Sequence, residues 1–269
     1  MTSLANPTGI PLHGRRVSAF AISAGSVLGA MVIWQTVSVL GIVRADLLPA
    51  PSDVLLALRD VLREGYRGTT LLQNTLATLW RCSAGFLAAC ATGVPLGLAI
   101  GRLPRAGAAI DWAIQFLRPL PPLSFLVLLI LWFGTGDLSK IMLLYLTAFP
   151  IIASAAAAGA AGVDQARIEA ARSLGCNRAQ LLAYVVLPSA LPIIFTGMRI
   201  ALAAAFSTVV AAELMAAKDG LGWMIFSASQ FLRTDVIMLG IIILGILGMA
   251  LARGLLALDR AVVHWRGRD

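Results

Sequence analysis

The side chains that could do chemical or mechanical work in this chain lie in three places. A polar, helix-forming segment carries Glu169 and ends near Pro188, between two long apolar runs. A cluster of prolines follows Arg118, and the carboxylate of Glu213 stands at the end of another apolar run. The first place offers charged groups to a second protein, the second bends a helix, and the third offers an ionisable group to a solute.

Catalysis is not expected from these groups. The two histidines, His13 and His264, lie in the terminal regions without metal-ligand spacing. Cys82 and Cys90 stand about 12 Å apart along one predicted helix, whereas a disulfide requires Cα atoms within about 7 Å. We therefore expect no catalytic residue, no metal site, no disulfide framework and no cofactor bound by this chain.

The composition indicates a membrane protein. The 269 residues are 59% hydrophobic and 13% charged, with a mean hydropathy of +0.88, whereas about 25% of the residues in a soluble domain are charged. A transmembrane helix needs about 20 mostly apolar residues, so we predict an all-α, polytopic membrane protein. The net charge of +8 does not predict nucleic-acid binding, because the arginines are scattered along the chain.

Six apolar stretches are assigned as transmembrane helices. The assigned ranges are 17–43, 78–101, 123–134, 141–163, 191–216 and 236–256. Gly93, Gly97 and Gly101 recur every four residues in the second, a spacing typical of close helix packing. An amphipathic helix capped by Ser52 precedes that span, and we expect it to lie on the membrane surface, with docking to a partner as the alternative.

The third span begins with a proline-rich break at Pro119, Pro121 and Pro122. Proline removes a backbone donor and clashes with the preceding turn, so the helix must bend or stop there. Broken helices at membrane depth are tolerated mainly where the backbone lines a cavity or is covered by protein. We therefore predict that this break belongs to a translocation path.

Six spans place both termini on one side of the membrane, and most arginines fall on that side. Because basic loops are retained in the cytoplasm, we predict cytoplasmic termini and a cytoplasmic loop at 164–190. The predicted organisation is a cytoplasmic tail at 1–16, a transmembrane domain at 17–256 and a second cytoplasmic tail at 257–269.

The cytoplasmic loop is predicted to form two short helices. Asp164 can cap the first, and Gly175 suits the left-handed conformation that ends it. Asn177 begins the second with Gln180 three residues later, as in a capping box, and Pro188 is expected to stop it. The result is a compact feature, here called the knob (164–190).

The side chains of the knob suit contact with another protein. Ala170 and Ala171 keep its surface shallow, and Glu169 and Arg172 can anchor charged partners. The alternative is a well-capped connector that packs only on its own chain.

The spacing of these knob residues, Glu-Ala-Ala, then Gly175, then Leu187-Pro188, resembles the cytoplasmic signature loop of bacterial ATP-binding-cassette (ABC) importer permeases. From about 72 to 256 the chain is similar to permeases of the nitrate, sulfonate and taurine subfamily. Further similar segments are 116–123 with 131–134, 211–214 with 220–222, and 234–236. The stretches 207–214 and 227–236 most resemble taurine permeases.

Two positions depart from the family pattern. Val185 stands where the loop signature usually has isoleucine, a loss of one methylene. Val127 stands where relatives often carry a second proline in the third span, which leaves the detailed shape of the path open.

The resemblance implies the type I ABC importer permease fold in a bacterial inner membrane. It also implies a homodimer, two cytoplasmic ATP-binding subunits and an extracytoplasmic solute-binding protein, with membrane lipid around the permease and no nucleic acid. ATP and magnesium would bind in the partner subunits, because neither Lys140 nor Lys218 follows a glycine in a phosphate-binding loop. The chain is therefore expected to be a transporter subunit and not an enzyme.

The resemblance and the proline break give two groups of candidate site residues. The ATPase-coupling group is Glu169, Ala170, Ala171, Arg172, Gly175, Leu187 and Pro188. The candidate path or gate group is Arg118, Pro119, Pro121, Pro122, Ser207 and Glu213. The alternatives are that Arg118 anchors the inner interface and that Glu213 is a hydrogen-bonded interfacial carboxylate.

The expected solute is taurine or another alkanesulfonate, with nitrate, bicarbonate or a vitamin precursor as alternatives. A passive channel and an intramembrane enzyme are alternatives of other classes. A channel would not require the knob. An intramembrane enzyme would need a nucleophile–base pair or metal ligands within the spans, and neither histidine lies in one.

Overall fold

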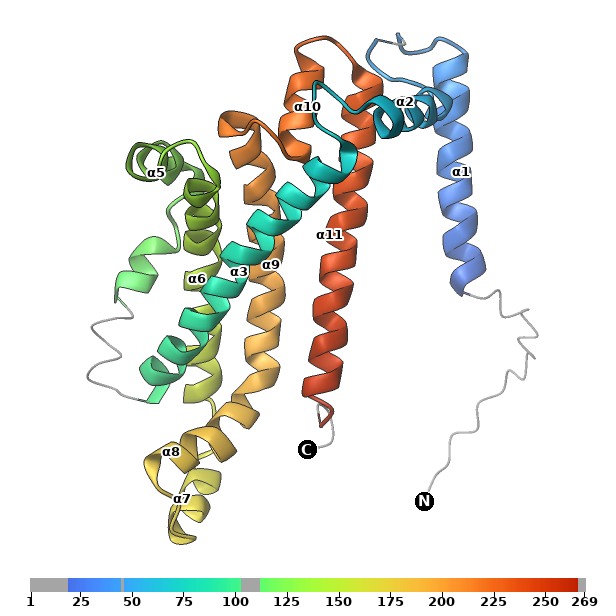
Figure 1. The fold of residues 1–269 in the computed structure, drawn as a ribbon. Coiled ribbons are helices and arrows are strands. Elements are labelled where there is room, and N and C mark those ends of the chain that lie inside the picture. Colours follow the sequence, from blue (N-terminus) through green and yellow to red (C-terminus); the bar gives the residue numbers. More distant parts are fainter. Residues whose placement is uncertain (1–18, 45, 103–111, 266–269) are drawn as a thin grey trace, which may run out of the picture. The chain divides into compact units, whose positions relative to one another are not determined.

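The computed structural model describes residues 19–44, 46–102 and 112–265, which form α-helices joined by turns (Figure 1). The predicted N-terminal tail at 1–16 lies outside the described residues. The chain divides into two units, Met1–Asp53 and Val54–Asp269, and each is described by itself.

The first unit contains α1 (Ala19–Val39), which is shorter at its C-terminal end than the predicted span at 17–43. The chain turns after α1, and Trp34 Nε1 donates to the carbonyl of Pro49 at 3.0 Å. Helix α2 (Pro51–Glu64), which belongs to the second unit from Val54 onward, begins one residue before the predicted cap, because proline suits the first helical position, where its missing N–H is not needed. Its buried side chains, Val54, Ala57 and Val61, lie on one face, as predicted for an amphipathic helix.

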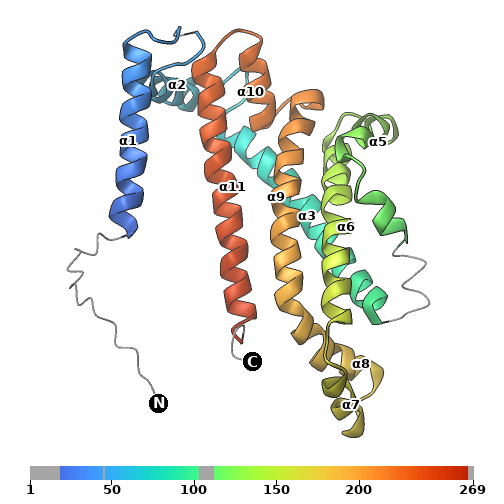
Figure 2. The same ribbon diagram turned by 180° about the vertical axis from the view of Figure 1, so that it is seen from behind.

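The second unit is a bundle of long helices with shorter helices at its ends (Figure 2). Its long members are α3 (Leu71–Arg102), α6 (Asp137–Ala161), α9 (Leu187–Ala216) and α11 (Thr234–Val262). Four helical segments in the described part are long and apolar enough to cross a membrane, namely α3, α6, α11 and the continuous helix Arg178–Ala216. The predicted first and third spans correspond to shorter apolar helices, Leu28–Val39 and Pro122–Phe133.

Helices α3 and α6 pack with their backbones in close approach, as the glycine spacing predicted. A Cβ atom at Gly97 would lie 2.3 Å from the carbonyl oxygen of Ala153, and one at Gly101 would lie 2.4 Å from that of Ala157. A side chain at either position would overlap the backbone of α6, so glycine is required there.

The prediction that Pro188 stops a helix is wrong. Helix α8 (Arg178–Leu181) continues through one π-helical turn, Leu182–Val186, directly into α9. The wider turn bonds the N–H of Leu187 to the carbonyl of Leu182, five residues back. Because a π turn shifts the hydrogen-bond register, Pro188 sits where its missing donor and its ring are tolerated. The fifth predicted span therefore begins before Leu191.

Helix α11 also extends beyond its predicted end at 256 and reaches Val262. Leu255 and Asp259 are buried, so the packed face of the helix continues past the predicted domain boundary. Shorter helices of the unit include α5 (Leu126–Phe133), α7 (Gln165–Ser173) and α10 (Leu221–Ser229).

Candidate functional site

The knob has the local structure that its caps predicted. The Asp164 carboxylate accepts a hydrogen bond from the N–H of Ala166 at 3.0 Å and so caps α7. Gly175 has φ of +83°, the left-handed conformation that favours glycine after a helix. Asn177 and Gln180 form a complete capping box, with both hydrogen bonds at 2.9 Å.

The outer surface of the knob is charged and open. Glu169, Ala170 and Arg172 are exposed, and the Leu174 side chain is 86% exposed. Ala171 differs from the expectation of a surface residue, because it is buried. The Glu169 carboxylate accepts one hydrogen bond from Gln165, also at the surface, at 3.1 Å.

The buried side of the knob joins it to the long helices. Ile168 and Ala171 of α7 belong to one apolar cluster with Leu98 of α3, Ala160 of α6 and Ile194 of α9. The continuous helix from α8 into α9 adds a covalent and helical connection. The knob and α9 are therefore joined by an unbroken helix as well as by packing.

The predicted proline break is present. Residues 112–117 are helical, Arg118 to Pro121 leave the helix, and a 3₁₀ turn, Pro122–Phe125, leads into α5. Two other predicted coupling residues, Leu187 and Pro188, lie far along the chain from Glu169. Both are half-buried at the start of α9.

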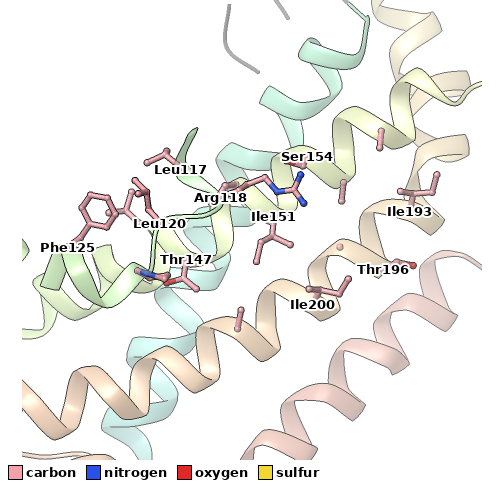
Figure 3. Close-up of a pocket in the computed structure, with 17 residues that line it drawn as sticks. Leu117, Arg118, Leu120, Phe125, Thr147, Ile151, Ser154, Ile193, Thr196 and Ile200 are labelled. Carbon is pink, nitrogen blue, oxygen red and sulfur yellow. The ribbon is translucent and has the colours of Figure 1, made fainter. Parts of the chain in front are cut away.

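A pocket of about 680 Å³ lies between the proline break, α6 and α9 (Figure 3). Arg118 and Pro122 line it, whereas Pro119 and Pro121 are not among its lining residues. Most of the lining is aliphatic, with Phe125 at one end. The Arg118 guanidinium extends over α6 toward Ser154 (Figure 3).

The polar groups of the pocket suit an anion. The Thr147 hydroxyl donates to the carbonyl of Leu143 at 2.8 Å, and the Thr196 hydroxyl donates to that of Pro192 at 2.9 Å. The buried Ser154 Oγ has no hydrogen-bond partner among the described residues. A serine hydroxyl carries one donor proton, so this group can donate to a bound ligand.

The charge of the pocket is positive. Within the described part of the chain, Arg118 forms no ion pair and no carboxylate lines the pocket. A guanidinium beside an aliphatic wall can bind a small organic anion, because it donates two parallel hydrogen bonds while the wall contacts the carbon chain.

A third group of charges lies at the other end of α6 and α9, around the buried guanidinium of Arg81 on α3. We call it the Arg81 cluster. Its members are Asn74, Thr78, Arg81, Asp137, Lys140, Glu213 and Asp219 with the turn at 220–222.

Arg81 is 2% exposed and contacts three carboxylates. Its Nη1 donates to Glu213 Oε1 at 2.8 Å and to the carbonyl of Asp219 at 3.0 Å, and its Nε donates to Asp137 Oδ1 at 2.8 Å. Its Nη2 also contacts the Asp219 carboxylate. Lys140, 1% exposed, donates to the carbonyls of Thr135 and Gly136.

Glu213 is fully buried in the Arg81 cluster. Besides Arg81, its carboxylate accepts from the Thr78 hydroxyl at 2.9 Å and from the N–H of Gly222 at 2.9 Å. It does not line the pocket at the proline break. Ser207, the other predicted path residue on α9, lies in a separate pocket beside Phe206 and donates to the carbonyl of Ala203.

Arg81, Lys140 and Ser154 are not among the site residues predicted from the sequence. A signal for the first two was available, because an ionisable residue within an apolar helix requires a partner. Ser154 gave no such signal, since a single hydroxyl in an alanine-rich run satisfies itself in most helices.

Comparison with known proteins places the chain among transport proteins. A family model described as binding-protein-dependent transport system inner membrane component matches residues 93–264, more than half of the chain. The taurine transport system permease protein TauC of Escherichia coli is 42% identical over 95% of this chain and 96% of its own length. A Bacillus subtilis permease named for the transport of aliphatic sulfonates is 35% identical over 90% of this chain and 87% of its length.

Two more distant proteins extend the comparison. The bicarbonate transport system permease protein CmpB of Synechococcus elongatus is 30% identical over 96% of this chain and 95% of its length. A solved structure of the MetNI methionine ABC transporter in an inward-facing conformation matches with a TM-score of 0.62 at 22% identity. The match covers 71% of this chain and 95% of that one, and it supports the fold alone.

Proposed function

This chain belongs to the inner-membrane components of binding-protein-dependent transport systems, and we propose that it is the permease subunit of an ATP-driven importer of taurine or another alkanesulfonate. It is a multi-pass protein of the inner membrane. The observation that carries the choice of solute is the pocket at the proline break, in which Arg118 faces an aliphatic wall with no described carboxylate. The names of two similar permeases, one for taurine and one for aliphatic sulfonates, support the same choice.

The pocket matches the chemistry of an alkanesulfonate. The sulfonate oxygens would accept hydrogen bonds from Arg118 and Ser154, and the short carbon chain would lie against Ile151 and Ile200. Access to the pocket would alternate between the two sides of the membrane as the helices around it tilt. Pro119 and Pro121 would then hold the break open without touching the solute, while Ser207 and Glu213 would act elsewhere on α9.

The proposed energy source is a partner. Two copies of the chain would assemble with two cytoplasmic ATP-binding subunits, which hold ATP and magnesium, and with a solute-binding protein outside. The ATP-binding subunits would dock on the exposed Glu169, Ala170 and Arg172 of the knob, while Gly175, Leu187 and Pro188 shape it. Their closure would move α9 through the continuous helix that begins in the knob.

This assignment uses a topology of six spans with both termini in the cytoplasm. The arginine-rich end of the bundle, with the knob, would face the cytoplasm, and the Arg81 cluster would face outward. The two shorter apolar helices would complete the six crossings together with the neighbouring residues of the chain.

Bicarbonate is the second candidate solute, because CmpB is similar along nearly the whole chain. Bicarbonate and nitrate are anions without a carbon chain, so they would leave the aliphatic wall of the pocket unused. The lining therefore favours an alkanesulfonate over either.

Uptake measurements test the proposal. A host strain that lacks this gene should lose uptake of radiolabelled taurine, and the wild-type chain should restore it. Ethanesulfonate should compete with taurine, whereas bicarbonate and nitrate should not. Full taurine uptake without the gene, or competition by bicarbonate alone, would reject the proposed solute.

The variant Arg118→Gln tests the pocket itself. Loss of one charge-assisted hydrogen bond should lower uptake about tenfold or more. Arg253→Gln is the matched control, because that arginine is exposed on α11 and does not line the pocket. Equal uptake by the two variants would exclude Arg118 from the path.

A further inference from the structure

A second groove, of about 420 Å³, lies between the C-terminal end of α3 and the knob. Three arginines from three helices line it, Arg102 of α3, Arg172 of α7 and Arg178 of α8. Figures 1 and 2 both show the end of α3 on the same side of the bundle as α7 and α8. The groove is separate from the pocket at the proline break and shares no lining residue with it.

Among the described residues, the arginines of the groove have no counter-charges. None of the three forms an ion pair within the residues that the structure describes, and no carboxylate lines the groove. Elsewhere in the same unit Arg81, Arg199 and Arg233 all have carboxylate partners. Three like charges around one cavity repel each other, so an anion bound among them would lower their free energy.

The rest of the groove is aliphatic. Its other lining residues are Leu98, Ala99, Leu181, Leu182 and Val186. Leu98 and Ala99 belong to an apolar helix long enough to cross a membrane, whereas Arg172 and Arg178 belong to the polar knob. The groove therefore passes from an apolar to a cationic lining at the end of a membrane-crossing helix.

We propose that this groove binds an anionic phospholipid of the cytoplasmic leaflet. The headgroup phosphate accepts hydrogen bonds from the guanidinium groups of Arg102 and Arg178, which match its oxygens in pairs, and an acyl chain lies along the leucines. Basic grooves at the cytoplasmic ends of membrane helices suit such lipids. The inference rests on the proposed function only in that the knob faces the cytoplasm.

The site would add a link between the end of α3 and the second helix of the knob, whose described side chains Leu98 and Leu181 pack in one apolar cluster. A phosphate held by both Arg102 and Arg178 joins the end of α3 to the second helix of the knob. The lipid would thus stabilise the position of the knob against the bundle, and the composition of the membrane would affect the coupling of ATP hydrolysis to transport.

Lipid titration of the purified full chain in detergent tests this site. Phosphatidylglycerol should raise the thermal unfolding temperature of the wild type, whereas phosphatidylcholine should not. The double variant Arg102→Gln with Arg178→Gln should bind phosphatidylglycerol more than tenfold more weakly, at about fivefold per arginine. Arg253→Gln with Arg260→Gln is the control, because it removes the same charge from exposed positions near the end of α11.

Competition experiments distinguish a lipid headgroup from a free phosphate. Inorganic phosphate and glycerol 3-phosphate should compete only weakly, because they lack the acyl chain that contacts the leucines. The double variant Arg102→Lys with Arg178→Lys keeps the charge and should retain part of the phosphatidylglycerol binding.

Three results would overturn the proposal. If the groove variant and its control bind phosphatidylglycerol equally well, the groove is not the lipid site. Equal potency of inorganic phosphate would make it a phosphate site. If the double variant Arg102→Gln with Arg178→Gln binds phosphatidylglycerol normally but no longer co-purifies with the ATP-binding subunits, the two arginines belong to a protein interface. None of these measurements involves taurine, so a failed solute assignment leaves the lipid result interpretable.

Discussion

The knob and the Arg81 cluster occupy opposite ends of α6 and α9, and both are rich in charge. In the knob, Glu169 and Arg172 are exposed and have no carboxylate–guanidinium contacts among the described residues. In the Arg81 cluster, Arg81 and Glu213 are buried and bonded to each other. The charges of the knob therefore remain accessible from solvent, whereas the charges of the Arg81 cluster neutralise each other inside the fold.

The difference has an energetic basis. Exposed ion pairs contribute about 0–1 kcal/mol, because water screens them. Removing one partner of a buried pair costs about 3–5 kcal/mol, because the remaining charge stays out of water. Substitutions in the Arg81 cluster should therefore affect folding, and substitutions on the exposed face of the knob should affect assembly.

Glu213→Ala should have the largest effect on stability. It removes one of the three carboxylates around the buried Arg81, leaves Thr78 and the N–H of Gly222 without their buried acceptor, and should cost about 3 kcal/mol or more. Thermal unfolding of the purified chain in detergent measures the loss.

The control for Glu213→Ala is Asp46→Ala. This change breaks an ion pair of the same 2.8 Å length between two exposed side chains, Arg44 and Asp46, and should cost less than about 1 kcal/mol. Equal unfolding temperatures for the two variants would remove the contrast between buried and exposed charge.

Gly97→Val should have the next largest effect. The new Cβ would overlap the carbonyl of Ala153 and force α3 away from α6, at a cost of about 1–3 kcal/mol. Gly245→Val is matched in side chain and also lies in a long helix, but it has open space around it. Thermal unfolding should show a lower unfolding temperature for Gly97→Val alone. An equal decrease for Gly245→Val would mean that the helix propensity of valine, and not the contact with α6, causes the loss of stability.

Asn177→Ala should weaken the knob locally. Loss of the capping box should cost about 1 kcal/mol and speed hydrogen exchange at the amides that begin α8, without lowering the unfolding temperature of the bundle. Asn177→Asp keeps an acceptor and should exchange as the wild type does. Faster exchange throughout α9 would show that the knob and the bundle unfold as one unit.

Glu169→Lys should have the smallest effect on stability, within about 0.5 kcal/mol, because the side chain is exposed. It should nevertheless reduce taurine uptake and co-purification of the ATP-binding subunits, if the knob is their docking surface. Glu64→Lys reverses an exposed acid on α2 and serves as the control. Normal uptake by Glu169→Lys would falsify the role of the knob in coupling.

The features predicted correctly depend on residues close together in the chain. The caps at Asp164 and Asn177 bond to groups two and three positions away. Pro188 was misjudged although its surroundings are also local, because a single π turn changes which backbone donor is needed. Pro95, Pro150 and Pro192 likewise lie inside α3, α6 and α9, so a proline in this chain does not by itself mark a helix end.

The Arg81 cluster was not predicted because its partners are far apart in the chain. Arg81 meets Asp137, Glu213 and Asp219 across 56, 132 and 138 positions. The sequence alone placed Glu213 near the end of a helix and left its role open. Which cation neutralises it depends on how α3, α6 and α9 pack.

The sequence by itself determined that the chain is a helical membrane protein, where its helices are capped, and which family its loop resembles. These properties follow from hydropathy and hydrogen bonding within short windows of the chain. Only the tertiary structure decided which charges are paired and which arginines remain open to a ligand. It also decided where Ser154, whose hydroxyl has no partner among the described residues, lines a cationic pocket. The reason is physical: burial and ion pairing depend on distances in space, which the packing of separate helices sets.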